Sequence, residues 1–464
     1  MIETFRTFAD TIEALSRLTD YEKMARHGQG YSRMSLEPIE RLLAEAAHPE
    51  GAFPAIHVTG TKGKGSTSTL AAAVLERVLP PVGLYTSPHL ERLTERIRVS
   101  GKEIGEDEWT ASLERLRPAW ERSLAGGGED ARPTFFDVIT ALAFEWFRRR
   151  GVRAAVVEVG LGGRLDSTNV VSTRVAVITN VSVDHAETLG PSPAHIAREK
   201  AGIVRGSIPV VTGVPPVTPA FGEVESAVKA RGGRLLRLGY ELKVGGFATA
   251  AGPAGPSGST FTATLPSGRV VRDLRLSMLG RHQAGNAAMA LAACEAFFGG
   301  EIPLSDAEIV AAIEAVRISG RAEYFPGSPD VLLDGAHNPA AAIALRTVLD
   351  DHFPGRPVVL LFGANGDKDV TGMLKSLRPR ASSAVFTRVA SPRAASVDDL
   401  RKAARQAGIW CDAREDPAEA LARARGFALE RRSLLVVTGS FYLVGQLRKE
   451  IADASAARPA AAGG

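Results

Sequence analysis

Cysteine is nearly absent from this chain of 464 residues, which contains only Cys294 and Cys411. The two stand far apart and lack the spacing of metal ligands, so the sequence supports neither a disulfide framework nor a cysteine-bound metal. We expect both to be small buried side chains in a reducing compartment.

Long apolar runs are missing as well. No uncharged apolar run approaches the roughly 18 residues that a membrane span requires. The N-terminal segment carries acidic side chains and an amphipathic helical rhythm, where a signal peptide would have a basic start followed by an apolar core. We therefore expect a cytoplasmic protein with no membrane partner.

Blocks of like charge are the third absence. Lys and Arg number 56 against 52 Asp and Glu, which gives a net charge of +4 and an isoelectric point near 9.1. The cations are spread along the chain instead of forming a basic block. Because small polyanionic substrates account for this modest excess, we expect no nucleic-acid partner.

What is present fits a globular protein of two or three domains, with 45% hydrophobic and 23% charged residues. From Ala55 onward, short β-branched runs alternate with longer helical stretches. The runs that predict buried strands are 55–59, 82–86, 152–159, 174–179 and 208–213, and the clearest helices are 66–79 and 134–149. Near-continuous hydrophobicity is typical of a parallel sheet covered on both faces, so this part predicts a doubly wound α/β domain.

The pattern changes after residue 233. Three segments predict hairpin-like strands, at 234–244, 259–266 and 268–280, around a Gly/Pro/Ala stretch at 245–259 that we predict to be a mobile loop. Helical character returns at 282–298 and 307–317.

A second α/β alternation follows, with strands predicted at 329–334, 356–363, 382–389 and 433–439. We place a domain boundary near Arg317–Gly320. This gives an N-terminal domain at 1–317, a smaller α/β domain at 318–450 and a disordered tail at 451–464.

The most specific motif is TGTKGKGST at 59–67, which follows a predicted strand and opens a predicted helix. Its glycines let backbone N–H groups face an anion, and the helix N-terminus adds partial positive charge. Lys64 can reach the β- and γ-phosphates, and the Ser66 hydroxyl can contact phosphate or Mg²⁺. The loop is shorter than GxxxxGK[ST], and a plain Gly-rich turn is the alternative. The lysine and hydroxyls in this context favour ATP binding.

Three candidate ligands for Mg²⁺ lie at or near predicted strand ends, namely Ser87, Glu158 and His185. A hydroxyl and a carboxylate suit Mg²⁺, and a carboxylate in the apolar run VVEVGLGG is costly to bury without a cation. His185 is a less expected donor, and taken alone it reads as a surface or hydrogen-bonding residue. Lys200, taken alone, reads as a solvated helix residue.

Nine motifs follow one another along the chain: TGTKGKGST, SPHLERLTERIRVSGKEI, FFDVITALAFEWF, EVGLGGRLDSTN, VSVDH, EKAGI, HQAGNAAMA, GRAE and DGAHNP. In this order they resemble the folylpolyglutamate synthase/dihydrofolate synthase family, which belongs to the Mur ligases. The resemblance runs from about Glu13 to Leu447. The SPHL…ERIR and EVGLGGRLDSTN runs make it specific, because they are not general to nucleotide-binding folds.

The resemblance implies the site residues. Contacts to ATP fall on Lys62, Gly63, Lys64, Gly65, Ser66, Asn286, Arg321 and Asp334, and contacts to Mg²⁺ fall on Ser87, Glu158 and His185. Contacts to the pterin-bearing substrate fall on Thr134, Phe135, Phe136, Asp137, Leu165, Asp166 and Ser167. Lys64, Lys200 and His337 are the implied catalytic residues. Lys200 matches a family lysine that is often carbamylated to a metal-bridging carboxylate, and His337 matches a residue near the incoming amino acid.

The function implied is ATP-dependent addition of L-glutamate to folate, with dihydropteroate as a second acceptor, by a monomeric enzyme. Two positions depart from the family pattern: Lys62 stands where Asn is common, and Asp137 stands where Glu is commoner. Three alternatives are a Mur-type ligase acting on a cell-wall precursor, a P-loop NTPase used as a switch or transporter component, and a nucleotide-binding module without activity. The SPHL segment speaks against the first, and the second α/β domain with DGAHN speaks against the second.

Overall fold

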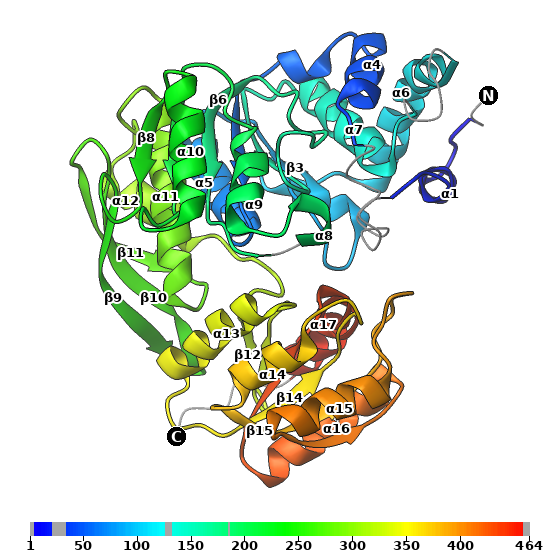
Figure 1. Cartoon of the computed structure of the whole chain (residues 1–464), viewed down its shortest axis with the longest axis vertical. Coiled ribbons are helices and arrows are strands. Elements are labelled where there is room, and N and C mark those ends of the chain that lie inside the picture. The colour runs from blue at the N-terminus through cyan, green and yellow to red at the C-terminus, as the bar shows by residue number, and fades with distance from the viewer. Residues whose placement is uncertain (1–3, 21–33, 126–131, 184–185, 458–464) are drawn as a thin grey trace. The chain divides into compact units, whose positions relative to one another are not determined.

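The structure is a computed structural model that describes residues 4–20, 34–125, 132–183 and 186–457 (Figure 1). It contains two mainly parallel sheets of eight and six strands and a small sheet of three strands. The α/β class predicted from the alternation of strands and helices is confirmed.

The chain divides into two compact units. Unit 1 comprises Met1–Gly245, Thr262–Leu274 and Gly285–Ile313, and unit 2 comprises Gly246–Phe261, Arg275–Ala284 and Glu314–Gly464. This division differs from a single boundary near 317–320, because two earlier segments also belong to unit 2.

Unit 1 is built on the eight-stranded sheet, in the order β4-β3-β2-β5-β1-β6-β7-β8. The strands are β1 (Ala55–Thr59), β2 (Val82–Tyr85), β3 (Ile97–Val99), β4 (Lys102–Glu103), β5 (Ala154–Glu158), β6 (Thr173–Ile178), β7 (Pro209–Thr212) and β8 (Arg234–Arg237). All pair in parallel except β3 and β4, which extend one edge antiparallel. From β1 the chain returns to β2 on one side, and from β6 it continues to β7 on the other. This reversal creates the crevice at strand carboxyl ends where α/β sheets bind ligands.

The helices of this part of the chain are α1 (Phe8–Ser16), α4 (Glu37–Glu45), α5 (Lys64–Val78), α6 (Glu106–Ala125), α7 (Phe135–Arg149), α8 (Ala186–Leu189), α9 (Pro193–Ala201), α10 (Pro219–Ala230), α11 (Arg281–Phe297) and α12 (Asp306–Glu314), with single 3-10 turns at Pro49–Gly51 and Leu93–Arg96. Helix α7 begins one residue after the predicted start at 134, because Thr134 is its N-cap and forms a capping box with Asp137 on the first turn. Its remaining residues are mostly buried.

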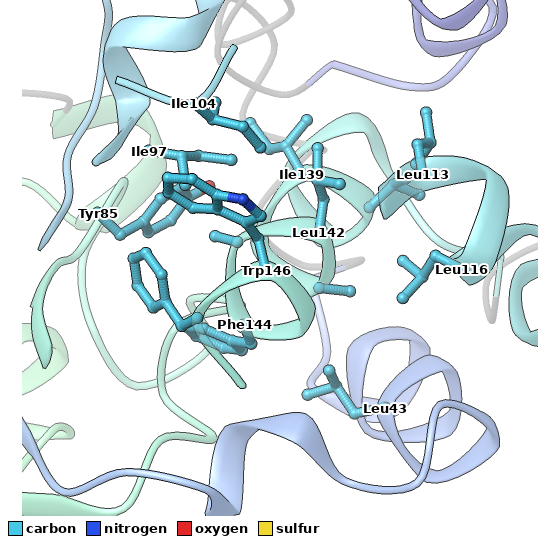
Figure 2. Close-up of a cluster of buried hydrophobic side chains, with 14 of the residues drawn as sticks. Leu43, Tyr85, Ile97, Ile104, Leu113, Leu116, Ile139, Leu142, Phe144 and Trp146 are labelled. Carbon is cyan, nitrogen blue, oxygen red and sulfur yellow. The ribbon is translucent and has the colours of Figure 1, made fainter. Parts of the chain in front are cut away.

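One hydrophobic cluster of unit 1 lies between α4, α6, α7 and strands of the sheet. Figure 2 shows its side chains, with Leu113 and Leu116 of α6 facing Ile139 and Leu142 of α7. A second cluster joins α9 and α10 to β6 and β7. Alternate residues of the parallel strands feed such clusters, which explains why their sequences are apolar almost throughout.

Truncating Phe144 should destabilise unit 1 strongly. Its ring is fully buried and stands edge-on to Phe53 at 6.0 Å and to Tyr85 at 6.5 Å. We expect Phe144→Ala to lower the free energy of unfolding by about 3–5 kcal/mol, because it leaves a cavity among fixed neighbours. Chemical denaturation followed by tryptophan fluorescence measures this. The Leu429 side chain is 49% exposed, so Leu429→Ala should change the free energy of unfolding little. Equal losses of this free energy in the two variants would contradict the assigned core.

Two predictions for the chain after residue 233 are wrong, and the first concerns the small sheet. Its strands are β9 (Lys243–Gly252), β10 (Gly255–Thr264) and β11 (Val270–Leu276), in the order β11-β10-β9. The stretch at 245–259 is therefore largely strand, and the predicted mobile loop is wrong. Likewise residues 234–237 form β8, which pairs in parallel with β7 instead of entering a hairpin. Composition misled in the first case, because Gly and Ala weaken strand propensity without preventing cross-strand pairing.

Unit 2 contains the six-stranded sheet, in the order β12-β13-β17-β14-β15-β16, with only β12 antiparallel to its neighbour. Its strands are β12 (Glu323–Phe325), β13 (Val331–Leu333), β14 (Val358–Phe362), β15 (Ala381–Phe386), β16 (Trp410–Ala413) and β17 (Leu434–Thr438). Its helices are α13 (Pro339–His352), α14 (Val370–Leu377), α15 (Val397–Ala407), α16 (Pro417–Glu430) and α17 (Phe441–Ala456). Residues 451–456, placed by sequence in a disordered tail, are thus helical, and residues 458–464 lie outside the described part. Within the described part, no helix is both long and apolar enough to cross a membrane.

Candidate active site

The phosphate loop connects β1 to α5, as the sequence predicts. Gly63 is the N-cap of α5 with φ 79°, a conformation that favours glycine, and α5 starts at Lys64. A Cβ added at Gly60 would lie 1.8 Å from Thr179 Oγ1, so no side chain fits there. The loop therefore presents the first free N–H groups of a 15-residue helix at the sheet's carboxyl edge.

Two residues that follow β6 hold this loop in shape. Asn180 Oδ1 accepts from Lys62 N at 2.9 Å while its Nδ2 donates to Lys62 O at 2.9 Å. Thr179 Oγ1 donates to the same carbonyl at 2.5 Å. Sequence reasoning missed Thr179 and Asn180. Their signal was a pair of polar side chains directly after the apolar strand RVAVI.

Glu158 lies at the carboxyl end of β5, only 3% exposed. Its Oε2 accepts from Ser87 N at 3.2 Å and lies 3.3 Å from where a Cβ on Gly65 would stand. Two of the predicted metal ligands are therefore neighbours beside the phosphate loop. His185, the third, lies outside the described residues. A buried carboxylate and a hydroxyl next to the predicted phosphate loop are oxygen donors of the kind Mg²⁺ prefers, so the residues fit this ion.

Lys64 and Lys200 converge on one backbone oxygen. Lys64 Nζ donates to Gly60 O at 3.2 Å, and Lys200 Nζ donates to the same atom at 2.9 Å. Lys200 lies in the last turn of helix α9 and is only 4% exposed, so its reading as a solvated helix residue is wrong. Burying an ammonium is costly unless it is compensated, which makes this position informative about function.

Asn286 also lies beside the loop. A Cβ on Gly63 would stand 2.5 Å from Asn286 Oδ1, so this amide occupies the space next to the start of α5. Asn286 is buried on α11, and the part of α11 that carries it belongs to unit 1. The structure thus brings this predicted nucleotide contact to the predicted phosphate loop.

The residues predicted to hold the pterin group gather around the N-terminus of α7. The Asp137 carboxylate accepts from Thr134 N at 2.8 Å, Thr134 Oγ1 at 2.7 Å and Ser167 Oγ at 2.6 Å. Burial raises the pKa of the Asp137 carboxyl, and these hydrogen bonds from Ser167 and Thr134 oppose the shift. Asp137 therefore joins the helix start to the segment after β5, although it is one methylene shorter than the Glu common in the family.

The aromatic and acidic members of this group differ in exposure. Phe135 is largely buried, with the Arg96 guanidinium 5.8 Å from its ring centroid, while Phe136 and Leu165 are half-buried. Asp166 is buried and already accepts three hydrogen bonds, from Leu161 N, Thr168 N and Thr168 Oγ1. Its carboxylate therefore shapes the loop. Phe136, Leu165 and Ser167 remain the better candidates for touching a substrate.

The predicted contacts from unit 2 cluster around Phe441, the first residue of α17. The Arg321 guanidinium lies 4.3 Å from the Phe441 ring centroid, and the His337 ring lies 5.6 Å from it. Asp334 follows β13, and its carboxylate accepts from Ala322 N and Ala336 N, both at 2.9 Å. Unit 2 therefore has its own polar group at strand carboxyl ends, with Arg321, Asp334 and His337 half-buried.

Replacing the buried carboxylate tests its role as a metal ligand. Glu158→Gln keeps the shape and can still accept from Ser87 N, but it loses the charge. We expect the Mg²⁺ concentration for half-maximal activity to rise by about tenfold or more. Glu295→Gln is the matched control, because that buried carboxylate is held by Ser267 instead. If the Glu158→Gln titration overlays that of the unmodified enzyme, Glu158 is a structural residue only.

Comparison with known proteins decides the family. The Mur ligase middle domain matches residues 58–294, and the Mur ligase glutamate ligase domain matches residues 320–441. The dihydrofolate synthase/folylpolyglutamate synthase of Mycobacterium tuberculosis is 36% identical over 390 residues, covering 80% of this chain and 77% of that relative. This chain belongs to the folylpolyglutamate synthase/dihydrofolate synthase family of Mur ligases.

Solved structures agree with this assignment. Folylpolyglutamate synthase of M. tuberculosis, complexed with ADP and AMPPCP, matches with a TM-score of 0.86 and 32% identity, over 97% of this chain and 99% of that one. Escherichia coli FolC in complex with DHPP and ADP matches with a TM-score of 0.80 and 29% identity, over 97% and 99% of the two chains. As a member of this Mur ligase family, the chain is an ATP-dependent ligase.

Proposed function

We propose that this ligase joins L-glutamate to a reduced folate, and that dihydropteroate is a second acceptor. One observation carries the proposal. The phosphate loop begins its helix against Glu158, and the segment that follows Glu158 reaches the start of α7 through the bond between Ser167 and Asp137. The predicted nucleotide site and the predicted pterin site thus both lie in unit 1 and are linked by this segment. The names of the relatives add the chemistry of the acceptor.

The reaction follows from what a carboxylate needs. A carboxylate is a poor electrophile, so its oxygen first attacks the γ-phosphorus of ATP, releasing ADP and forming an acyl phosphate. Lys64 and the N–H groups of α5 neutralise the charge of the transferred phosphoryl group. The glutamate amine then attacks the carbonyl carbon, and the tetrahedral intermediate collapses to the amide with loss of inorganic phosphate and of one proton from the amine. Catalysis is mainly positioning and charge stabilisation.

Ser87 and Glu158 would hold Mg²⁺, together with His185. When bound, the ion supplies charge neutralisation for the phosphates. We further propose that Lys200 is carbamylated: its uncharged amine attacks CO₂, forming an N–C bond with release of one proton. Two ammonium groups on the single oxygen of Gly60 repel each other, and a carbamate would remove one of these charges.

Arg321, Asp334 and His337 are the proposed contributions of unit 2, with the first two toward the nucleotide and His337 toward the amino acid. Phe441 supports this, because its ring fixes both Arg321 and His337. We also propose a cytoplasmic monomer. Both cysteines are free, as is usual in a reducing compartment.

Phosphate release tests the proposal. We expect rapid release of phosphate when ATP, tetrahydrofolate and glutamate are combined, and only background release when either tetrahydrofolate or glutamate is omitted. A switch-type NTPase would release phosphate even in the absence of tetrahydrofolate and glutamate. Release that needs a cell-wall precursor in place of folate would assign the chain to another Mur ligase.

A further inference from the structure

His57 is an unusual residue for the centre of a parallel sheet. It lies in the middle of β1, is 0% exposed, and pairs with Val157 of β5 and Ala176 of β6. An imidazole buried among apolar strands is costly unless it makes a hydrogen bond that matters. The phosphate chemistry does not use it.

Within the described residues, the His57 ring makes a hydrogen bond through Nε2 to a residue that is distant in sequence. Nε2 lies 2.9 Å from Thr168 Oγ1, and Thr168 Oγ1 lies 2.5 Å from Asp166 Oδ1. A hydroxyl carries one proton, which Thr168 gives to the carboxylate. The Thr168 hydroxyl oxygen must therefore accept a hydrogen bond from His57 Nε2. This assigns His57 the neutral tautomer that carries its proton on Nε2. His57 Nδ1 is then a bare acceptor, and it is buried with no hydrogen-bond partner in the described part of the chain.

This chain of bonds ends in the segment between β5 and β6. Asp166 Oδ2 accepts from Leu161 N at 2.8 Å, which closes the segment into a loop. Ser167, between the two bonded residues, donates to Asp137 at the start of α7. Burial lowers the pKa of His57 to about 3, so the ring stays neutral at any working pH. A neutral donor leaves the middle of β1 uncharged, whereas a lysine or arginine at this position would bury a charge there.

We propose that His57 is a positioning residue for the pterin-bearing acceptor: through Thr168 and Asp166 it fixes the loop that presents Leu165 and Ser167. The phosphate loop is held separately, by Thr179 and Asn180. Removing the His57 bond should therefore weaken acceptor binding and leave ATP binding nearly unchanged. This inference rests on the proposed function for the identity of the acceptor.

Steady-state kinetics separates the two substrates. We expect His57→Leu to raise the KM for tetrahydrofolate about tenfold, the equivalent of one hydrogen bond, with the KM for ATP within about twofold. His57→Gln, whose amide can donate from nearly the same place, should recover most of the loss. Thr168→Val also removes the bond to Asp166, so it should raise the KM for tetrahydrofolate at least as much as His57→Leu does. The double variant should add little to Thr168→Val, because both single changes remove the bond between His57 and Thr168.

Ser112→Ala is the control, since it deletes a buried hydroxyl that has no hydrogen-bond partner in the described part of the chain. Its kinetics should equal those of the unmodified enzyme. A readout independent of activity is the ¹⁵N NMR spectrum of the His57 ring. The unmodified enzyme should show the tautomer protonated on Nε2, and Thr168→Val should no longer show this single tautomer. Unchanged folate KM in folded His57→Leu, or equal increases in both KM values, would overturn the inference. Absence of ligation by the unmodified enzyme would instead overturn the proposed function.

Discussion

Lys64→Ala should reduce ligation by at least about 100-fold while the protein stays folded. Lys64 opens α5, and in the part of the chain that the structure describes its ammonium donates to Gly60 O, so its removal should cost the fold little. In the reaction, the same ammonium would offset charge on the transferred phosphoryl group. The measurement is the rate of phosphate release with ATP, tetrahydrofolate and glutamate present, and circular dichroism checks that the variant is folded.

Lys229→Ala is the control for this variant, because Lys229 is exposed on α10. It should retain full activity. Near-normal turnover by a folded Lys64→Ala protein would remove the basis for placing the ATP phosphates at this loop.

Lys200→Ala should lose most activity for a different reason. The side chain is buried, and the carbamate that we propose on it would provide oxygen atoms next to the phosphate loop. A short carboxylic acid added to the buffer should enter the vacated space and restore part of the rate. Bicarbonate depletion should slow the unmodified enzyme and leave Lys200→Ala unaffected.

Rescue distinguishes the carbamate from a purely structural lysine. If Lys200→Ala is folded and fully active, the modification has no role. If the variant is inactive, acetate has no effect and bicarbonate depletion does not slow the unmodified enzyme, Lys200 acts as an ammonium that holds Gly60, and the carbamate is wrong.

The parts of the fold that were predictable from sequence are those in which local signals agree. Strand β1 has the predicted limits and α5 begins two residues earlier than predicted, because an apolar run ends at a glycine loop that caps a helix. The start of α7 was equally clear, since Thr134 and Asp137 form a local capping box. Strand β8 was assigned to a hairpin because pairing partners depend on the whole sheet, which one segment's pattern does not record.

The candidate site shows the same limit. Local motifs identified Lys64, Glu158 and Ser87, and the structure brings the last two together. Burial of Lys200 could not be read from its helix, because it depends on Gly60, 140 residues away. His57 escaped notice for a related reason. Its partner Thr168 is 111 residues distant, and a histidine in an apolar strand has no meaning until that contact is known.

Incorporation of labelled glutamate tests the central claim most directly. The purified chain is incubated with ATP, Mg²⁺ and ¹⁴C-glutamate, separately with tetrahydrofolate and with dihydropteroate, and the products are separated by chromatography. We predict ATP-dependent label in a folate product with tetrahydrofolate, and label in dihydrofolate with dihydropteroate. Incorporation with tetrahydrofolate but not with dihydropteroate would restrict the activity to polyglutamylation. No incorporation with either acceptor, by protein that binds ATP, would contradict the assignment of this chain as a folate ligase.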